Sequence, residues 1–220
     1  MRLLHCPLPL NWVILGWVVL LPFAVLSLRR VRAGVTLGGA QQHLWLAGVV
    51  LLASLWTLQA RAVEGAAFGL LGAAFYALVF GRDWARLGLL AAVTLQATFG
   101  SGSWANAGLT GLLLAALPTA LAGALQRQLE HRLPKNLFVF IIGNGFFVTL
   151  TVTAATSVAL LAAAGMLQPE TAASEQIGYA LLLAWGEALV SGMLFSALVV
   201  FGPALVLTYR QDLYLPRRGL

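Results

Sequence analysis

The positions of the cationic residues constrain the fold of this chain more than any other feature. Long apolar runs alternate with short polar segments. Eleven of the thirteen Lys and Arg residues fall on one side of a bilayer when the runs are threaded through it in order. Lys and Arg in short loops are retained on the cytoplasmic side, so the pattern predicts a multi-pass membrane protein with its N-terminus outside and its C-terminus inside. The predicted inner cations are Arg29, Arg30, Arg32, Arg82, Arg86, Arg127, Arg132, Lys135, Arg210, Arg217 and Arg218, with Arg2 and Arg61 outside.

Composition agrees with a bilayer environment. The 220 residues are 60% hydrophobic and 9% charged, whereas soluble domains carry about 25% charged residues. The net charge of +6 resides in short loops between apolar runs, which favours a topological signal over a nucleic-acid partner. Cys6 is the only cysteine, so the chain has no internal disulfide.

Seven apolar segments are candidates for membrane spans, since a helix needs roughly 20 residues to cross the hydrocarbon core. We therefore expect an all-α bundle of about seven transmembrane helices that forms one integral membrane domain over residues 1–220. Small residues in every span indicate close helix packing. The candidates are Leu10–Leu28, His43–Leu58, Gly65–Phe80, Leu87–Phe99, Asn106–Leu125, Leu137–Gly165 and Ile177–Tyr209, with Arg82–Arg86 as the inner cap of the third.

Three of these segments are irregular. Leu87–Phe99 is short and runs into a Gly-Ser segment at 100–104, which forms either a loop dipping between helices or an ordinary outer turn. Pro118 predicts a kink. The long segment from Leu137 to Gly165 either tilts or breaks at its Gly-Asn-Gly sequence, residues 143–145.

Glu187 is the most unusual polar residue, because it lies about ten residues into an apolar run. A carboxylate at that depth costs roughly 2.5 to 3.5 kcal/mol on insertion scales and is a functional candidate by default. Two interpretations are open. Glu187 either acts on a cation, a proton or a basic partner, or is a hydrogen-bonded acid that joins two helices.

Other polar side chains are weaker candidates. Gln96 and Asn106 flank the Gly-Ser segment and either line a cavity or hydrogen-bond between helices. Glu64, three residues after Arg61, is either paired with it on one helical turn or a solvated cap. His5 and Cys6 carry ligand atoms for a soft or borderline metal ion, although two adjacent residues are a weak pattern. The chain contains no P-loop, no nucleophile with a candidate base and no metal-ligand motif, so it does not indicate an enzyme or a built-in cofactor.

Two stretches resemble a known family. Gly65-Ala-Ala-Phe-Gly-Leu-Leu-Gly72 is similar to a Gly-Thr-Ser-Gly-His-Leu-Leu-Gly segment, and Gln96-Ala97 with the following Gly-rich loop and Asn106 is similar to a second one. Both occur in the substrate-binding membrane subunits of energy-coupling-factor transporters for cobalt and nickel, the CbiM/NikM type, and in their permease-like relatives. The relatives also show a late helix with Glu, Gly-Met and Pro, as at Glu187, Gly192-Met193 and Pro203 here, and a tail like residues 212–215.

The departures from this family fall on the metal site. The family's site uses an N-terminal Met-His, but this chain begins Met1-Arg2-Leu3-Leu4-His5. The family's intramembrane His corresponds to Gly69, which has no ligand atom. The resemblance therefore does not transfer a metal site, and the identity of any bound ion stays open.

The resemblance implies a membrane-embedded substrate-binding component of an energy-coupling-factor uptake transporter, for a metal cation or another small solute. Its location would be a bacterial-type inner membrane, with a second transmembrane subunit and ATPase subunits as partners. Glu64, Gln96, Asn106 and Glu187 would then line the substrate cavity. The alternative is a non-transporting structural or accessory subunit of a larger complex, which the loss of the family's His favours.

Overall fold

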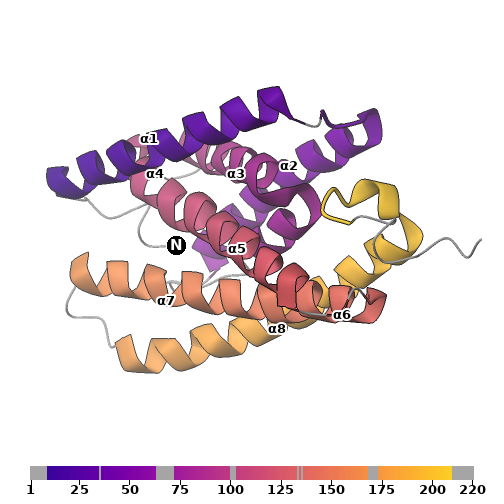
Figure 1. Ribbon diagram of the computed structural model, residues 1–220. Coiled ribbons are helices and arrows are strands. Elements are labelled where there is room, and N and C mark those ends of the chain that lie inside the picture. The colour runs from indigo at the N-terminus through magenta and orange to yellow at the C-terminus, as the bar shows by residue number, and fades with distance from the viewer. Residues whose placement is uncertain are drawn as a thin grey trace, which may run out of the picture.

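The computed structural model describes residues 9–34, 36–62, 72–99, 103–132, 134, 136–167 and 173–209, and over these ranges it is helical with no strand. This confirms the all-α prediction. Within the described ranges six helices follow one another, the last leading into a short 3₁₀ turn, η4 (Pro203–Leu205). They are α1 (Leu10–Ala33), α2 (Gly39–Ala62), α3 (Ala73–Phe99), the continuous α4 (Trp104–Gly111), η2 (Leu112–Ala116) and α5 (Leu117–Arg132), the continuous α6 (Leu137–Ile142), η3 (Gly143–Val148) and α7 (Thr149–Leu167), and α8 (Ala173–Phe201) (Figure 1).

Four helices among the described residues are long and apolar enough to cross a membrane. They are Leu10–Ala33, Trp104–Arg132, Leu137–Met166 and Gln176–Phe201. Large apolar side chains are exposed on their outer faces, including Val18, Leu182, Met193 and Phe201. In lipid such a surface is solvated rather than exposed to water. The chain is thus a multi-pass membrane protein, while the count of about seven spans and the orientation of the termini stay predictions.

Helix α3 is the centre of the bundle, because it packs against α1, α2, α4, α5, α7 and α8. Gly81 interrupts it with φ 73° and ψ 170°, a conformation that is essentially restricted to glycine. The two arms fold back on each other there, since a Cβ at Gly88 would lie 2.5 Å from the Tyr76 ring. In a straight helix these residues would be about 18 Å apart.

This reversal changes the role of the segment predicted to be an inner cap. Arg82–Arg86 begins the second arm of α3 instead of closing the first. Arg86 is only 3% exposed, so it is not a solvated flank. The predicted spans Gly65–Phe80 and Leu87–Phe99 are therefore joined through one kinked helix. The first seven residues of the former, 65–71, lie outside the described part of the chain.

Two π-helical turns occur where the sequence predicted a kink or a break. The first, η2, directly precedes Pro118, and the N–H of Leu117 bonds to the carbonyl of Leu112. The second, η3, begins at Gly143 and includes the Gly-Asn-Gly sequence. Both helices continue through these turns, because the wider turn re-satisfies backbone groups that a proline or a local bulge would leave unpaired.

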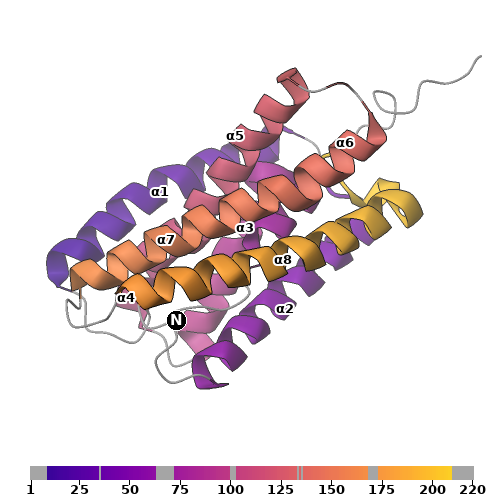
Figure 2. The ribbon, with the colours of Figure 1, turned by 90° about the horizontal axis from the view of Figure 1, so that it is seen from below.

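Neighbouring helices pack closely along the bundle (Figure 2). Helix α1 lies on α4, where a Cβ at Gly16 would be 2.5 Å from the backbone nitrogen of Leu109. Helix α7 and the preceding η3 lie along α8, with Gly145 of η3 against Gly192. Small residues at such crossings let backbones approach, as the composition predicted.

The last helix ends earlier than the predicted Ile177–Tyr209 span. Helix α8 stops at Phe201, because Gly202 departs from helical geometry and Pro203 starts a 3₁₀ turn. The chain then returns to α3, where Leu207 donates its backbone N–H to the carbonyl of Val79 at 2.8 Å. The hydroxyl of Thr208 donates to the carbonyl of Leu78. These bonds cap the carbonyl end of the first arm of α3.

Candidate functional site

Glu187 lies in the middle of α8 and is 2% exposed. Its Oε1 atom accepts a hydrogen bond from the backbone N–H of Gly72 at 2.9 Å. The same oxygen accepts a second bond from the hydroxyl of Thr153 on α7 at 3.2 Å. One carboxylate oxygen therefore connects α8, α7 and the start of α3, which compensates part of the cost of placing the group away from water.

Gly72 presents its N–H because it directly precedes the first arm of α3. Its φ is +61°, and its carbonyl accepts the N–H of Tyr76 at 3.0 Å, which opens the helix. A Cβ at this position would lie 2.5 Å from Cδ2 of Leu52 on α2. The Glu187 carboxylate thus lies at a helix N-terminus, where unpaired N–H groups and the helix dipole favour negative charge.

Gln96 and Asn106 are both buried, on neighbouring antiparallel helices. Two contacts set the register: Arg86 bonds to Thr119 at 3.1 Å, and a Cβ at Gly111 would be 3.1 Å from Leu90. By this register Gln96 and Asn106 lie at the same height in the bundle. They come from α3 and α4 respectively.

The Glu187 carboxylate and the Gln96–Asn106 pair lie at similar heights along the bundle. Because Tyr76 meets Gly88 across the arms of α3, Gly72 lies near the level of Ala92. Gln96 is one helical turn beyond, about 6 Å along the axis. Oε1 of Gln96 is buried and has no hydrogen-bond partner among the described residues. A buried acceptor of this kind calls for a water, an ion or a ligand.

A row of threonines on α7 belongs to the same polar interior and was not predicted from the sequence. Thr149, Thr153 and Thr156 are buried at i, i+4 and i+7, a spacing that puts them on one face. The hydroxyls of Thr149 and Thr156 have no partner among the described residues. The sequence does contain this row, but the alternating threonines Thr149, Thr151 and Thr153 hide which of them share one helical face.

Several predicted candidates lie outside the described residues. These are Glu64, the position Gly69, and the weak metal candidates His5 and Cys6. Within the described ranges, no group of three or more His, Cys, Asp and Glu side chains is placed to hold a metal ion. The proposed binding roles of Glu64, His5 and Cys6 stay predictions, as do those of Gln96, Asn106 and Glu187.

Comparison with protein families decides the wider class. A sequence profile of the CbiM family, the cobalt uptake substrate-specific transmembrane region, matches residues 6–205. The chain belongs to the CbiM family. The resemblance drawn from residues 65–72 and 95–108 is thereby confirmed, and the match extends well beyond those stretches. No curated protein and no solved structure matches the chain.

CbiM membership implies a membrane-embedded, substrate-binding component of cobalt or metal uptake. Such a component is part of a transporter rather than an enzyme, and the family normally works with other transporter subunits. Glu187 and Gly72 gain a specific meaning in this context. Gly72 is the last residue of the segment that parallels the family's Gly-Thr-Ser-Gly-His-Leu-Leu-Gly sequence, so the buried carboxylate holds the end of that segment.

Proposed function

We propose that this chain is the substrate-binding membrane component of an energy-coupling-factor-type uptake transporter for a metal cation or another small solute. It would act in a bacterial-type inner membrane with a second transmembrane subunit and ATPase subunits. The sequence has no P-loop, so energy from ATP would come from those partners.

The observation that carries this proposal is the hydrogen bond from Gly72 to Glu187. It joins a buried acid to the end of the segment most similar to the family's substrate segment. Glu187 would act as a positioning residue that holds Gly72 at the start of α3. Gln96, with its unpartnered oxygen, and Asn106 would line the adjacent polar interior, and Glu64 would belong to the same site.

Uptake measurements test this role. We expect Glu187→Gln to lower the uptake of radioactive cobalt or nickel in the native host when the variant replaces the wild-type chain at equal membrane abundance. Gln keeps an acceptor oxygen but loses the charge, so the fold should persist. The matched control is Glu130→Gln, because Glu130 is exposed in the last turn of α5, away from Glu187. Unchanged uptake in Glu187→Gln would contradict the role of Glu187.

The loss of the family's His at Gly69 supports a second candidate, a non-transporting accessory subunit. Metal uptake by cells that lack the chain distinguishes the transport role from the accessory role. If cobalt, nickel and other divalent ions enter equally well without it, the proposal of metal uptake fails. Co-purification of an ATPase and a large membrane subunit supports transport, whereas a different assembly supports the accessory role.

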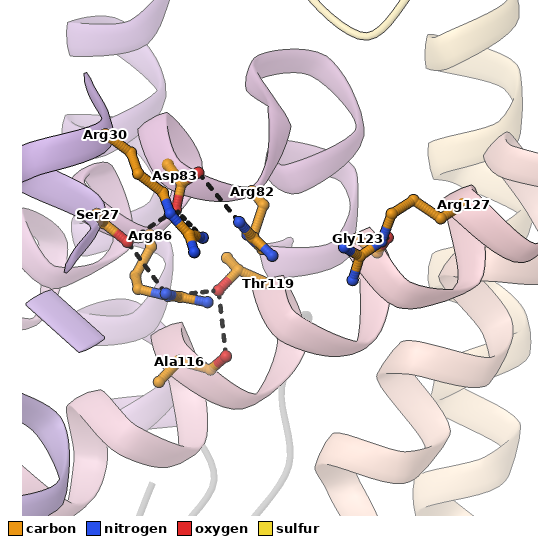
Figure 3. A network of polar contacts seen from close by, with 9 residues as sticks. All are labelled: Ser27, Arg30, Arg82, Asp83, Arg86, Ala116, Thr119, Gly123 and Arg127. Atoms are coloured by element: carbon orange, nitrogen blue, oxygen red, sulfur yellow. Dashed lines mark hydrogen bonds and ion pairs between the residues drawn. The ribbon is translucent and has the colours of Figure 1, made fainter. Parts of the chain in front are cut away.

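We also propose that the cationic end of the bundle faces the cytosol, with about seven spans and an outer N-terminus. The support is the grouping of Arg30, Arg82, Arg86 and Arg127 at this one end (Figure 3). A protease applied to intact cells should leave a tag fused after Leu220 uncut. Cleavage from outside would reverse the proposed orientation.

A further inference from the structure

A second network of polar side chains lies at the cationic end of the bundle (Figure 3). Asp83 is within 3.8 Å of Arg30 and 3.4 Å of Arg82. The hydroxyl of Ser27 donates to Asp83 at 3.1 Å, and Arg86 donates to Ser27 at 3.0 Å. Helices α1 and α3 are joined through this network.

The network has more positive than negative charge. Arg30 and Arg82 both form ion pairs with Asp83, and Arg86 reaches the same carboxylate through the hydroxyl of Ser27. Arg86 is buried and is used inside the bundle. The side chains of Arg30 and Arg82 are 53% and 28% exposed, so they are available to an anion from outside.

These two arginines line a pocket of about 250 Å³. Gly81, Asp83, Trp84 and Leu207 complete much of its wall. A water molecule occupies about 30 Å³ of liquid, so the pocket has room for a phosphate ester. The reversal at Gly81 creates it, because the two arms of α3 separate there and the chain after α8 covers one side.

The surroundings of the pocket favour a lipid over a soluble anion. Arg30 lies in the last turn of α1, a helix long and apolar enough to span the membrane. The same helix exposes Leu26 and Val25 one turn earlier, a surface suited to acyl chains. Trp84 also packs edge-to-face on Trp45 with 6.0 Å between ring centroids, and Trp is enriched at the membrane–water interface.

We infer that this pocket binds the phosphate of an anionic lipid headgroup. Basic pockets between membrane helices on the cytoplasmic side bind such headgroups. Asp83 orients Arg30 and Arg82 and also limits the negative charge of the anion that can bind beside it. Its carboxylate disfavours a doubly charged free phosphate more than the singly charged phosphodiester of phosphatidylglycerol.

Native mass spectrometry of the purified full-length chain tests the inference. The probes are phosphatidylglycerol and phosphatidylcholine with identical acyl chains. We expect phosphatidylglycerol to be retained preferentially, and Arg30→Gln and Arg82→Gln each to weaken its binding about fivefold. Arg132→Gln is the matched control, since Arg132 is exposed near the same end of the bundle but outside the pocket.

Equal binding of the two lipids would overturn the inference, as would an equal effect of Arg132→Gln, which would indicate a non-specific surface charge. Inorganic phosphate should not compete with phosphatidylglycerol at similar concentrations. Competition would assign the pocket to a soluble anion instead. Arg30→Gln keeps the experiment decisive if Arg82→Gln impairs folding, because the Arg30 side chain is largely exposed. Uptake of metal is not the readout, so the result is independent of the proposed transport function.

Discussion

The carboxylate of Glu187 and the backbone N–H of Gly72 are joined by a 2.9 Å hydrogen bond across 115 positions of sequence. This bond ties the middle of α8 to the start of α3, and Thr153 brings α7 to the same oxygen. Stability and function should therefore respond differently to different substitutions of this acid.

Glu187→Ala should destabilise the protein more than Glu187→Gln. Alanine removes the acceptor of two buried donors, which costs about 1–3 kcal/mol per unsatisfied group, whereas glutamine retains an oxygen. Thermal unfolding of the purified variants in the same detergent measures the difference. Equal melting temperatures for the two variants would show that the hydrogen bonds to Glu187 do not stabilise the fold.

Gly72→Ala should also lower the melting temperature, for two separable reasons. Alanine at φ +61° carries backbone strain of roughly 1–2 kcal/mol, and its Cβ would lie 2.5 Å from Leu52. Adding Leu52→Ala to Gly72→Ala should relieve the contact but not the strain. A double-mutant cycle with both single variants measures the coupling, and strict additivity would contradict the predicted overlap.

Arg86→Met should destabilise the junction of α1, α3 and α5. Methionine preserves an apolar stem but removes the donors to Ser27 and Thr119, at a cost of about 1–3 kcal/mol for bonds from a charged group. Arg127→Met is the control. Arg127 is exposed, and its Nε donates to the carbonyl of Gly123 in its own helix. That change should stay within about 0.5 kcal/mol. Similar losses from both would show that burial of Arg86 is not stabilising.

Gly16→Ala should separate α1 from α4. The added methyl would meet the backbone of Leu109 at 2.5 Å, and backbone cannot yield as a flexible side chain does, so a cost of about 1–3 kcal/mol is expected. Gly186→Ala on α8 serves as the control, since nothing lies within 4 Å of its Cβ position. Unfolding in detergent compares the two. A harmless Gly16→Ala would mean that α1 shifts easily on the bundle.

Much of the secondary structure could be predicted from the sequence. Runs such as Leu10–Leu28 and Asn106–Leu125 lie inside observed helices, because apolar length and loop composition are local properties. The family could also be recognised, since the match over residues 6–205 includes the short motifs at residues 65–72 and 95–108. The burial of Glu187, Gln96 and Asn106 agrees with their placement in apolar runs.

Other features depend on which helices become neighbours, and local pattern does not specify that. Arg86 was predicted to flank a helix as an inner cation, yet it is buried, because the reversal at Gly81 turns it toward Ser27 and Thr119. The threonine row on α7 gained significance only when Thr153 was found beside Glu187.

The sequence by itself determined the solvent of this protein and the order of its helices, because hydropathy and loop charge act along the chain. Tertiary structure alone decided that a carboxylate on α8 holds the start of α3, and that Arg30 and Arg82 line one pocket. Both depend on contacts between residues more than 50 positions apart, and their energies are set by packing geometry in three dimensions.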